Sequence, residues 1–122
     1  MARMMIAMQL DAPGEPLRRV ERPLPDPGPG EIRVAVTACG VCRTDPHVAD
    51  GDIRGPLPIV PGHEIVGRVD AMGAGAGPFR LGDRVGIAWL ADTCGTCSYC
   101  RGGRENLCDH AVFTGFSRDG GF

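Results

Sequence analysis

The sequence predicts a mainly β protein, a small β-barrel with short helices and a four-cysteine lobe. Short apolar stretches alternate with polar residues and are separated by turn signals, since Gly and Pro (19 and 11 residues) make up about a quarter of the chain. Four of the six cysteines lie within one short segment, a density that suits metal ligation. A length of 122 residues accommodates one domain, residues 1–122, with a modest core.

Strands are expected at five places along the chain. They are residues 4–10, 17–22, 31–38, 65–72 and 84–89. The clearest is residues 31–38, in which Ile32, Val34 and Val36 alternate with other residues, so that this strand should be half-buried. In residues 84–89 the alternating apolar positions end at Trp89.

One short helix is expected over residues 46–50, where the sequence offers both a start and a stop signal. Asp45 suits the N-cap before a first-turn proline, and Gly51 suits the end. Residues 23–30 hold a proline at every second position and should form a turn region. Residues 73–77 alternate Gly with Ala, but a proline and another strand follow instead of a helix, which favours a turn over a phosphate-binding loop.

Charge and hydropathy argue against nucleic-acid and membrane partners. The net charge is −2, from 13 basic and 15 acidic residues, and no basic block occurs. No apolar run approaches the roughly 18 residues of a membrane span, and the run at residues 4–8 is too short for a signal peptide. We therefore expect a cytoplasmic protein, in which cysteines stay reduced and available to metals.

The four-cysteine segment is the most specific local signal. Cys94, Cys97, Cys100 and Cys108 read C-x2-C-x2-C-x7-C, which suits a closed tetrahedral structural zinc. An iron–sulfur cluster is one alternative, but the ferredoxin run that opens in this way continues x3-C-P, whereas here the last interval has seven residues and Asp109 follows. Disulfides are the other alternative, and a reducing compartment disfavours them. We predict zinc.

A second set of metal-binding side chains comes from two separate segments. Cys42 supplies a thiol, and His63 with Glu64 supplies an imidazole and a carboxylate. A catalytic zinc takes such ligands and keeps one position open for water or substrate. Two or three candidates from spacing alone do not establish a site.

Three motifs occur in a fixed order: Cys-Arg-Thr-Asp-Pro-His at residues 42–47, Gly-His-Glu-Ile-Val-Gly at residues 62–67, and the four-cysteine lobe. Together they resemble zinc-dependent alcohol dehydrogenases of the medium-chain dehydrogenase/reductase superfamily over essentially the whole chain. The resemblance implies a GroES-like catalytic domain and reversible oxidation of an alcohol to an aldehyde or ketone, with hydride transfer to NAD or NADP. It also implies a catalytic and a structural zinc per subunit, a small-molecule substrate and a homo-oligomer.

The resemblance also implies roles for the residues around the catalytic zinc. Cys42 and His63 match two ligands, and the third would lie beyond Phe122. Glu64 would lie behind the zinc as an alternative ligand, and Asp45 would orient the ligand imidazole.

Further roles concern proton transfer and binding. Thr44 would take the proton of the alcohol, and His47 would deliver it to water through the cofactor ribose. Arg43 would pair with the cofactor pyrophosphate, and Trp89 would form a wall of the alcohol pocket. Without the resemblance, Thr44 is better interpreted as a helix-entry threonine and His47 as an ordinary exposed histidine. Trp89 would first be interpreted as a core residue. Cys39 is interpreted as a buried apolar thiol.

No G-x-G-x-x-G segment occurs in the chain, so we expect the dinucleotide-binding domain to be missing and the chain to be an N-terminal fragment, inactive by itself. Two alternatives stay open. One is an inactive fragment or a stand-alone structural zinc-binding β-domain. The other is a related dehydrogenase that acts on a polyol, on threonine or on a formaldehyde adduct.

Overall fold

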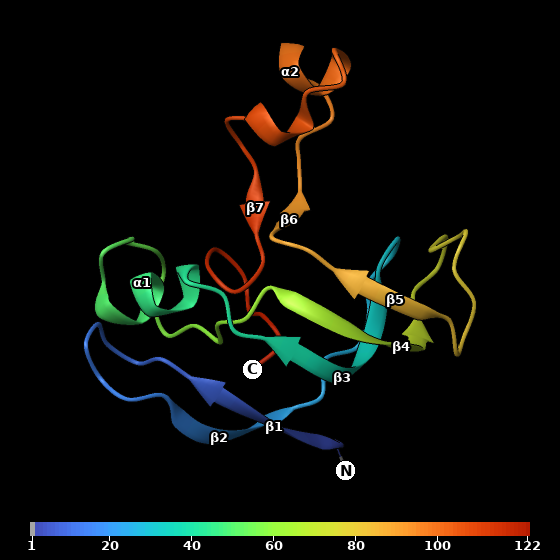
Figure 1. The fold of residues 1–122 in the computed structure, drawn as a ribbon. Coiled ribbons are helices and arrows are strands. Elements are labelled where there is room, and N and C mark those ends of the chain that lie inside the picture. The colour runs from blue at the N-terminus through green and yellow to red at the C-terminus, as the bar shows by residue number, and fades with distance from the viewer. Residues whose placement is uncertain (1) are drawn as a thin grey trace.

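The computed structural model describes residues 2–122 and consists mainly of short strands (Figure 1). In chain order the elements are β1 (Met4–Gln9), β2 (Arg18–Pro23), β3 (Ile32–Gly40), α1 (Thr44–Asp50), β4 (Glu64–Met72), β5 (Arg84–Ile87), β6 (Leu90–Asp92), α2 (Ser98–Arg101), the 3-10 turn η1 (Glu105–Leu107) and β7 (Val112–Phe113). A strand is present at each of the five expected places. The fifth ends at Ile87, earlier than expected, so Trp89 lies in a bend between β5 and β6.

The strands form three separate antiparallel sheets, with the orders β1-β2, β3-β4-β5 and β6-β7. The prediction of a mainly β protein is therefore confirmed, but within residues 2–122 the sheets do not join into a closed barrel. A barrel needs strand pairing around a full circle. Here the central sheet has β3 at one edge and β5 at the other, and no further strand of residues 2–122 continues it at either edge.

Strand β4 has the regular alternation of a strand with one buried face. Ile65, Gly67 and Val69 are buried, while the residues between them are exposed. Strand β3 differs from its expected half-burial, because residues 35–38 are exposed and Val36 keeps 47% of its surface accessible. Val36 lines an open hollow of about 720 Å³, to which Val34, Ile65 and the proline-rich turn also contribute, so its side chain remains accessible.

A small core holds helix α1 against the N-terminal sheet. Leu10, Val48 and Ile59 are buried together. Leu10 and Ile59 also pair through their backbones, with N–H to carbonyl distances of 2.8 and 3.0 Å. The position of α1 therefore depends on residues from three distant parts of the chain.

The end of helix α1 agrees with the sequence prediction, but its start does not. The N-cap is Arg43, without a side-chain cap, so the assignment of Asp45 as N-cap is wrong: the helix starts earlier and Asp45 lies in its first turn. The stop signal is confirmed, because Gly51 follows the helix with φ 83° and its N–H bonds the carbonyl of Val48 at 3.2 Å. A positive φ of this size favours glycine.

The last residues of the chain return to the segment that precedes β4. Gly120 N–H bonds the carbonyl of Val60 at 2.6 Å, and Phe122 N–H bonds that of Pro61 at 3.1 Å. The carboxylate of Asp119 accepts the N–H of Val60 at 3.0 Å and pairs with Arg22 at 2.8 Å. These contacts fix the segment that leads into His63.

The four-cysteine lobe stands apart from the rest of the molecule. Figure 1 shows α2 and its neighbouring turn at the far end of the ribbon formed by β6 and β7. None of the helices in residues 2–122 is long and apolar enough to cross a membrane.

Candidate metal centres

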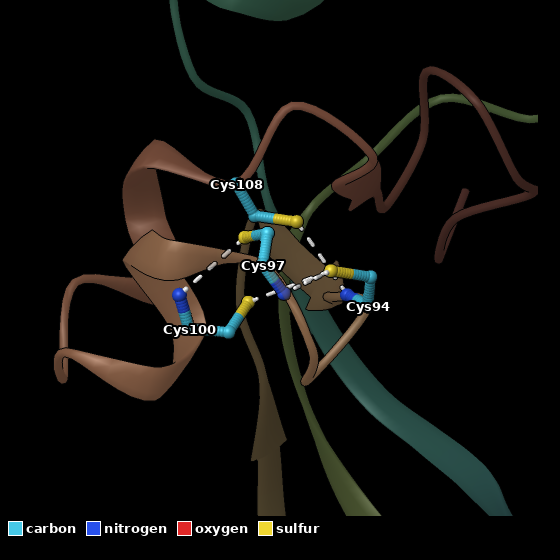
Figure 2. A group of neighbouring side chains, drawn as sticks. All are labelled: Cys94, Cys97, Cys100 and Cys108. Atoms are coloured by element: carbon cyan, nitrogen blue, oxygen red, sulfur yellow. Dashed lines mark hydrogen bonds between the residues drawn. The ribbon is translucent and has the colours of Figure 1, made fainter.

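Four thiols converge in the lobe. The sulfurs of Cys94, Cys97, Cys100 and Cys108 all lie within 4.8 Å of one another, and Figure 2 shows them pointing toward a common space. The sulfurs of Cys94 and Cys100 are 3.9 Å apart. Because a tetrahedron with Zn–S bonds of about 2.3 Å has edges of about 3.8 Å, this arrangement fits a zinc ion. A disulfide would need the two sulfurs about 2.05 Å apart, and all four cysteines are free thiols.

Backbone N–H groups point at these sulfurs. Cys94 Sγ accepts the N–H of Cys97 at 3.3 Å, and Cys97 Sγ accepts that of Cys100 at 3.5 Å, where Cys97 is the N-cap of α2. Cys108 Sγ accepts the N–H groups of Cys94 and His110 at 3.5 and 3.4 Å. Such donors stabilise thiolates, the form in which cysteine binds metals.

In the folded lobe without a metal, the pKa of one thiol is lowered and that of another is raised. Hydrogen bonds from the backbone and hydroxyl of Thr96, followed by the N–H of Cys97, lower the pKa of Cys94 to about 5. Burial raises the pKa of Cys100 to about 11. At neutral pH one thiolate therefore lies beside a protonated thiol, and metal binding must displace the proton of Cys100.

A second group of possible metal-binding side chains comes from two separate segments of the chain. The metal-binding atoms of Cys42, His63 and Glu64 are all within 4.8 Å of one another. Cys42 immediately precedes the turn into α1, His63 precedes β4, and Glu64 is the first residue of β4. The donor set of one thiol, one imidazole and one carboxylate fits a zinc site with room for a further ligand.

Asp45 connects the two segments of this group. Its carboxylate accepts the N–H of Cys42 at 2.9 Å and the N–H of Gly62 at 3.2 Å. It also lies 3.5 Å from Nδ1 of His63, and both side chains are at most 9% exposed. With Nδ1 turned to Asp45, Nε2 is the nitrogen left for a metal.

The backbone before His63 requires glycine. Gly62 has φ 98°, and a Cβ there would lie 2.8 Å from Cys39 Sγ and 2.6 Å from the ring of Phe122. Cys39 is half-buried rather than fully buried, and burial raises the pKa of its thiol. It therefore stays protonated, and the candidate ligand sets leave it out.

The residues expected to move a proton or bind a cofactor lie along α1. The Thr44 hydroxyl is 3.9 Å from Cys42 Sγ. His47 is one turn further and partly exposed, with Nδ1 2.9 Å from a carboxylate oxygen of Asp52. Arg43 is exposed at the start of the helix and forms no ion pair with another part of residues 2–122.

Trp89 closes one side of the second group. Its ring contacts that of His63 edge-on, with centroids 4.9 Å apart. It also stacks on Phe113 at 4.8 Å and lies 5.9 Å from Phe116. The sequence reasoning named Trp89 but missed both phenylalanines and Asp52. The two phenylalanines could have been found from their position shortly after the lobe, and Asp52 from its position two residues beyond the end of α1.

The structure thus brings Cys42, Thr44, Asp45, His63 and Glu64 together, with Trp89 against His63. His47 lies beside Asp52 instead, and the lobe cysteines form a separate centre.

Comparison with known proteins finds a matching family model, a relative of similar sequence and solved structures of similar fold. Residues 28–122 match the family model for the alcohol dehydrogenase GroES-like domain. The AdhA protein of Mycobacterium tuberculosis is 52% identical over 97% of this chain, which spans 37% of that protein's length. A cobalt- and zinc-bound thermostable alcohol dehydrogenase from Pyrobaculum aerophilum superposes with a TM-score of 0.89 at 33% identity, over 98% of this chain and 37% of that one.

A third relative was solved with a nicotinamide cofactor. The alcohol dehydrogenase RspB from E. coli CFT073, complexed with NADH, superposes with a TM-score of 0.89 at 36% identity, over 98% of this chain and 34% of that one. The family model covers most of the chain, residues 28–122. The chain therefore belongs to the alcohol dehydrogenase GroES-like domain family.

Proposed function

We infer that residues 1–122 are the N-terminal part of the GroES-like catalytic domain of a zinc-dependent, NAD- or NADP-linked alcohol dehydrogenase. The observation that carries this proposal is the group of Cys42, His63 and Glu64, fastened by the buried carboxylate of Asp45. The chain spans about a third of the length of the relatives to which it was compared, so the remaining ligand and the dinucleotide site would come from outside these residues.

In the proposed enzyme, Cys42 and His63 would hold the catalytic zinc, and Glu64 would serve as an alternative ligand. When bound, zinc supplies Lewis acidity that makes the hydroxyl of an alcohol more acidic, and the nicotinamide accepts the hydride. Asp45 orients the imidazole of His63 and favours the tautomer whose Nε2 is free to bind the metal. The four lobe cysteines hold a structural zinc away from the chemistry.

Thr44 and His47 carry the proton in this proposal. The Thr44 hydroxyl lies beside the thiol of Cys42. It would accept the proton that an alcohol bound there releases while it passes its own proton on toward His47. His47 is one helical turn further and 42% exposed, so it can pass a proton to bulk water. Both residues project from one short helix, which keeps the distance between them constant.

Two further residues contribute to binding. Arg43 is exposed at the start of α1, where a guanidinium is available to a cofactor pyrophosphate. Trp89 lies against His63 and would limit the alcohol pocket on that side, which favours a small alcohol or aldehyde. We further propose a cytoplasmic homo-oligomer that binds neither nucleic acid nor membranes, in line with a net charge of −2 and no basic block.

A comparison of residues 1–122 with the full-length protein tests this proposal. The full-length protein should reduce NAD or NADP in the presence of a small alcohol and contain about two zinc ions per chain. Residues 1–122 alone should show no such activity and hold nearer one zinc than two, because the lobe has all four ligands locally, whereas the second group offers three residues and no dinucleotide site.

Metal analysis and cofactor absorbance, on preparations whose end at Phe122 is established by mass, measure both quantities. Turnover by residues 1–122 alone would contradict the fragment interpretation. A full-length protein with zinc but no dehydrogenase activity on any alcohol would contradict the proposed function and favour a structural zinc-binding domain.

A further inference from the structure

A carboxylate that the proposed function does not use lies beside His47. Asp52 Oδ2 is 2.9 Å from His47 Nδ1, and the two side chains are 63% and 42% exposed. The structure gives His47 Nε2 no hydrogen-bond partner within residues 2–122. One ring nitrogen is therefore held by a carboxylate, and the other remains available.

The backbone places Asp52 at this position. Helix α1 ends at Asp50, and Gly51 turns the chain with φ 83°. The N–H of Ile53 then bonds back to the carbonyl of His47 at 3.3 Å, so the segment after the helix folds over its last turn. A Cβ on Gly51 would lie 2.7 Å from the Cβ of Pro13, which leaves the turn little freedom. The side chain of Asp52 is therefore delivered to His47 by a defined turn.

The contact decides which ring nitrogen carries the proton. An ionised carboxylate only accepts hydrogen bonds, so a neutral imidazole 2.9 Å from it must carry its proton on Nδ1. Nε2 then has a lone pair and can accept a proton. Without such a partner, neutral histidine in water favours the opposite tautomer, in which Nε2 is protonated and cannot accept.

We propose that Asp52 is a positioning residue that fixes the ring and the tautomer of His47, so that Nε2 accepts the proton in the relay. This inference rests on the proposed function, because the relay itself does. The proton arrives at Nε2 and leaves the imidazolium to water, so that the ring is regenerated without any further reactant. Asp52 keeps its charge throughout and touches neither substrate nor metal.

The first measurement is the tautomer of His47. In the full-length protein labelled with ¹⁵N at histidine, long-range ¹H–¹⁵N correlation spectra distinguish a protonated from an unprotonated ring nitrogen. The spectrum is recorded about two pH units above the ordinary histidine pKa of about 6.5. His47→Gln identifies the signals. We expect Nδ1–H in the wild type and a shift toward Nε2–H in Asp52→Ala, and an unprotonated Nδ1 in the wild type would overturn the proposal.

The second measurement is kinetic. We expect Asp52→Asn and Asp52→Ala to lower kcat for alcohol oxidation by about three- to tenfold, less than the hundredfold or more of a general acid–base group that acts directly. In the His47→Gln background, either substitution should cause no further loss, because Asp52 acts only through His47. Asp50→Asn is the matched control. Asp50 lies two residues before Asp52, and its carboxylate is exposed and forms no side-chain hydrogen bond within residues 2–122, so this substitution removes the same charge without touching His47.

A structural effect would give a different pattern. Exposed ion pairs contribute little to folding, so Asp52→Asn should leave the melting temperature unchanged. If the double variant with Asp52→Asn and His47→Gln has a lower kcat than His47→Gln alone, Asp52 does not act through His47 and the proposal fails. If the tautomer is as expected but neither His47→Gln nor Asp52→Asn affects the rate, the place of His47 in the proposed relay is refuted instead.

Discussion

Thr44→Ala will lower kcat for alcohol oxidation in the full-length protein by about a hundredfold or more, the range expected when a general acid–base group is removed. The hydroxyl of Thr44 lies 3.9 Å from Sγ of Cys42, a candidate metal ligand. His47→Gln will cost less, about tenfold, because water partly replaces an exposed imidazole further along the path. Steady-state rates across about pH 6 to 9 measure both effects.

Two controls separate this effect from loss of structure. Thr44→Ser keeps the hydroxyl and should retain most of the activity. Alanine is a better helix former than threonine, so Thr44→Ala should not weaken α1, and the zinc content should stay the same. Full activity in Thr44→Ala would remove Thr44 from the mechanism.

Cys108→Ser will release the metal of the lobe and unfold residues 94–108. Within these residues no apolar side chain other than cysteine is buried, and Cys108 is 8% exposed, so no apolar core holds the lobe together. Small zinc domains of this kind obtain their folding free energy from the metal, about 10–16 kcal/mol of apparent binding in zinc-finger peptides. Serine is a poor substitute for a thiolate. We expect one zinc fewer per chain and rapid proteolysis within the lobe.

The matched control is Cys39→Ser, which removes a half-buried thiol outside the two candidate ligand sets. It should leave the zinc content of the lobe unchanged. Wild-type protein that contains iron with visible absorbance, or disulfides among the lobe cysteines, would contradict the zinc assignment. So would a Cys108→Ser protein with full zinc content and an intact lobe.

Features set by local sequence were predicted well. Each expected strand is present, and α1 ends at the glycine that signalled its end. The four lobe thiols converge because their spacing within one short segment leaves them few ways to lie apart. These features depend on alternation, turn residues and short-range spacing, all of which one sequence displays.

Features set by distant contacts were predicted less well. Asp45 has the sequence context of an N-cap, but its carboxylate is used by the N–H of Gly62, seventeen residues away. The strand that should have reached Trp89 breaks at Ile87, and Trp89 instead packs on His63 and Phe113, partners that adjacent residues do not indicate. The exposed half of β3 likewise follows from the missing barrel closure, which is a property of the whole arrangement of strands.

The position of Asp45 implies that the two candidate centres acquire metal in different ways. One carboxylate secures the backbone of Cys42 and of Gly62 and lies beside His63, so these ligands are preorganised in the folded protein. Zinc bound at the group of Cys42, His63 and Glu64 would therefore exchange by ligand substitution, while the protein around it stays folded. In the lobe, binding and folding are one event, so exchange there proceeds through local unfolding. A brief fall in available zinc would thus empty the centre near α1 reversibly, whereas the lobe, once emptied, would lie open to proteases.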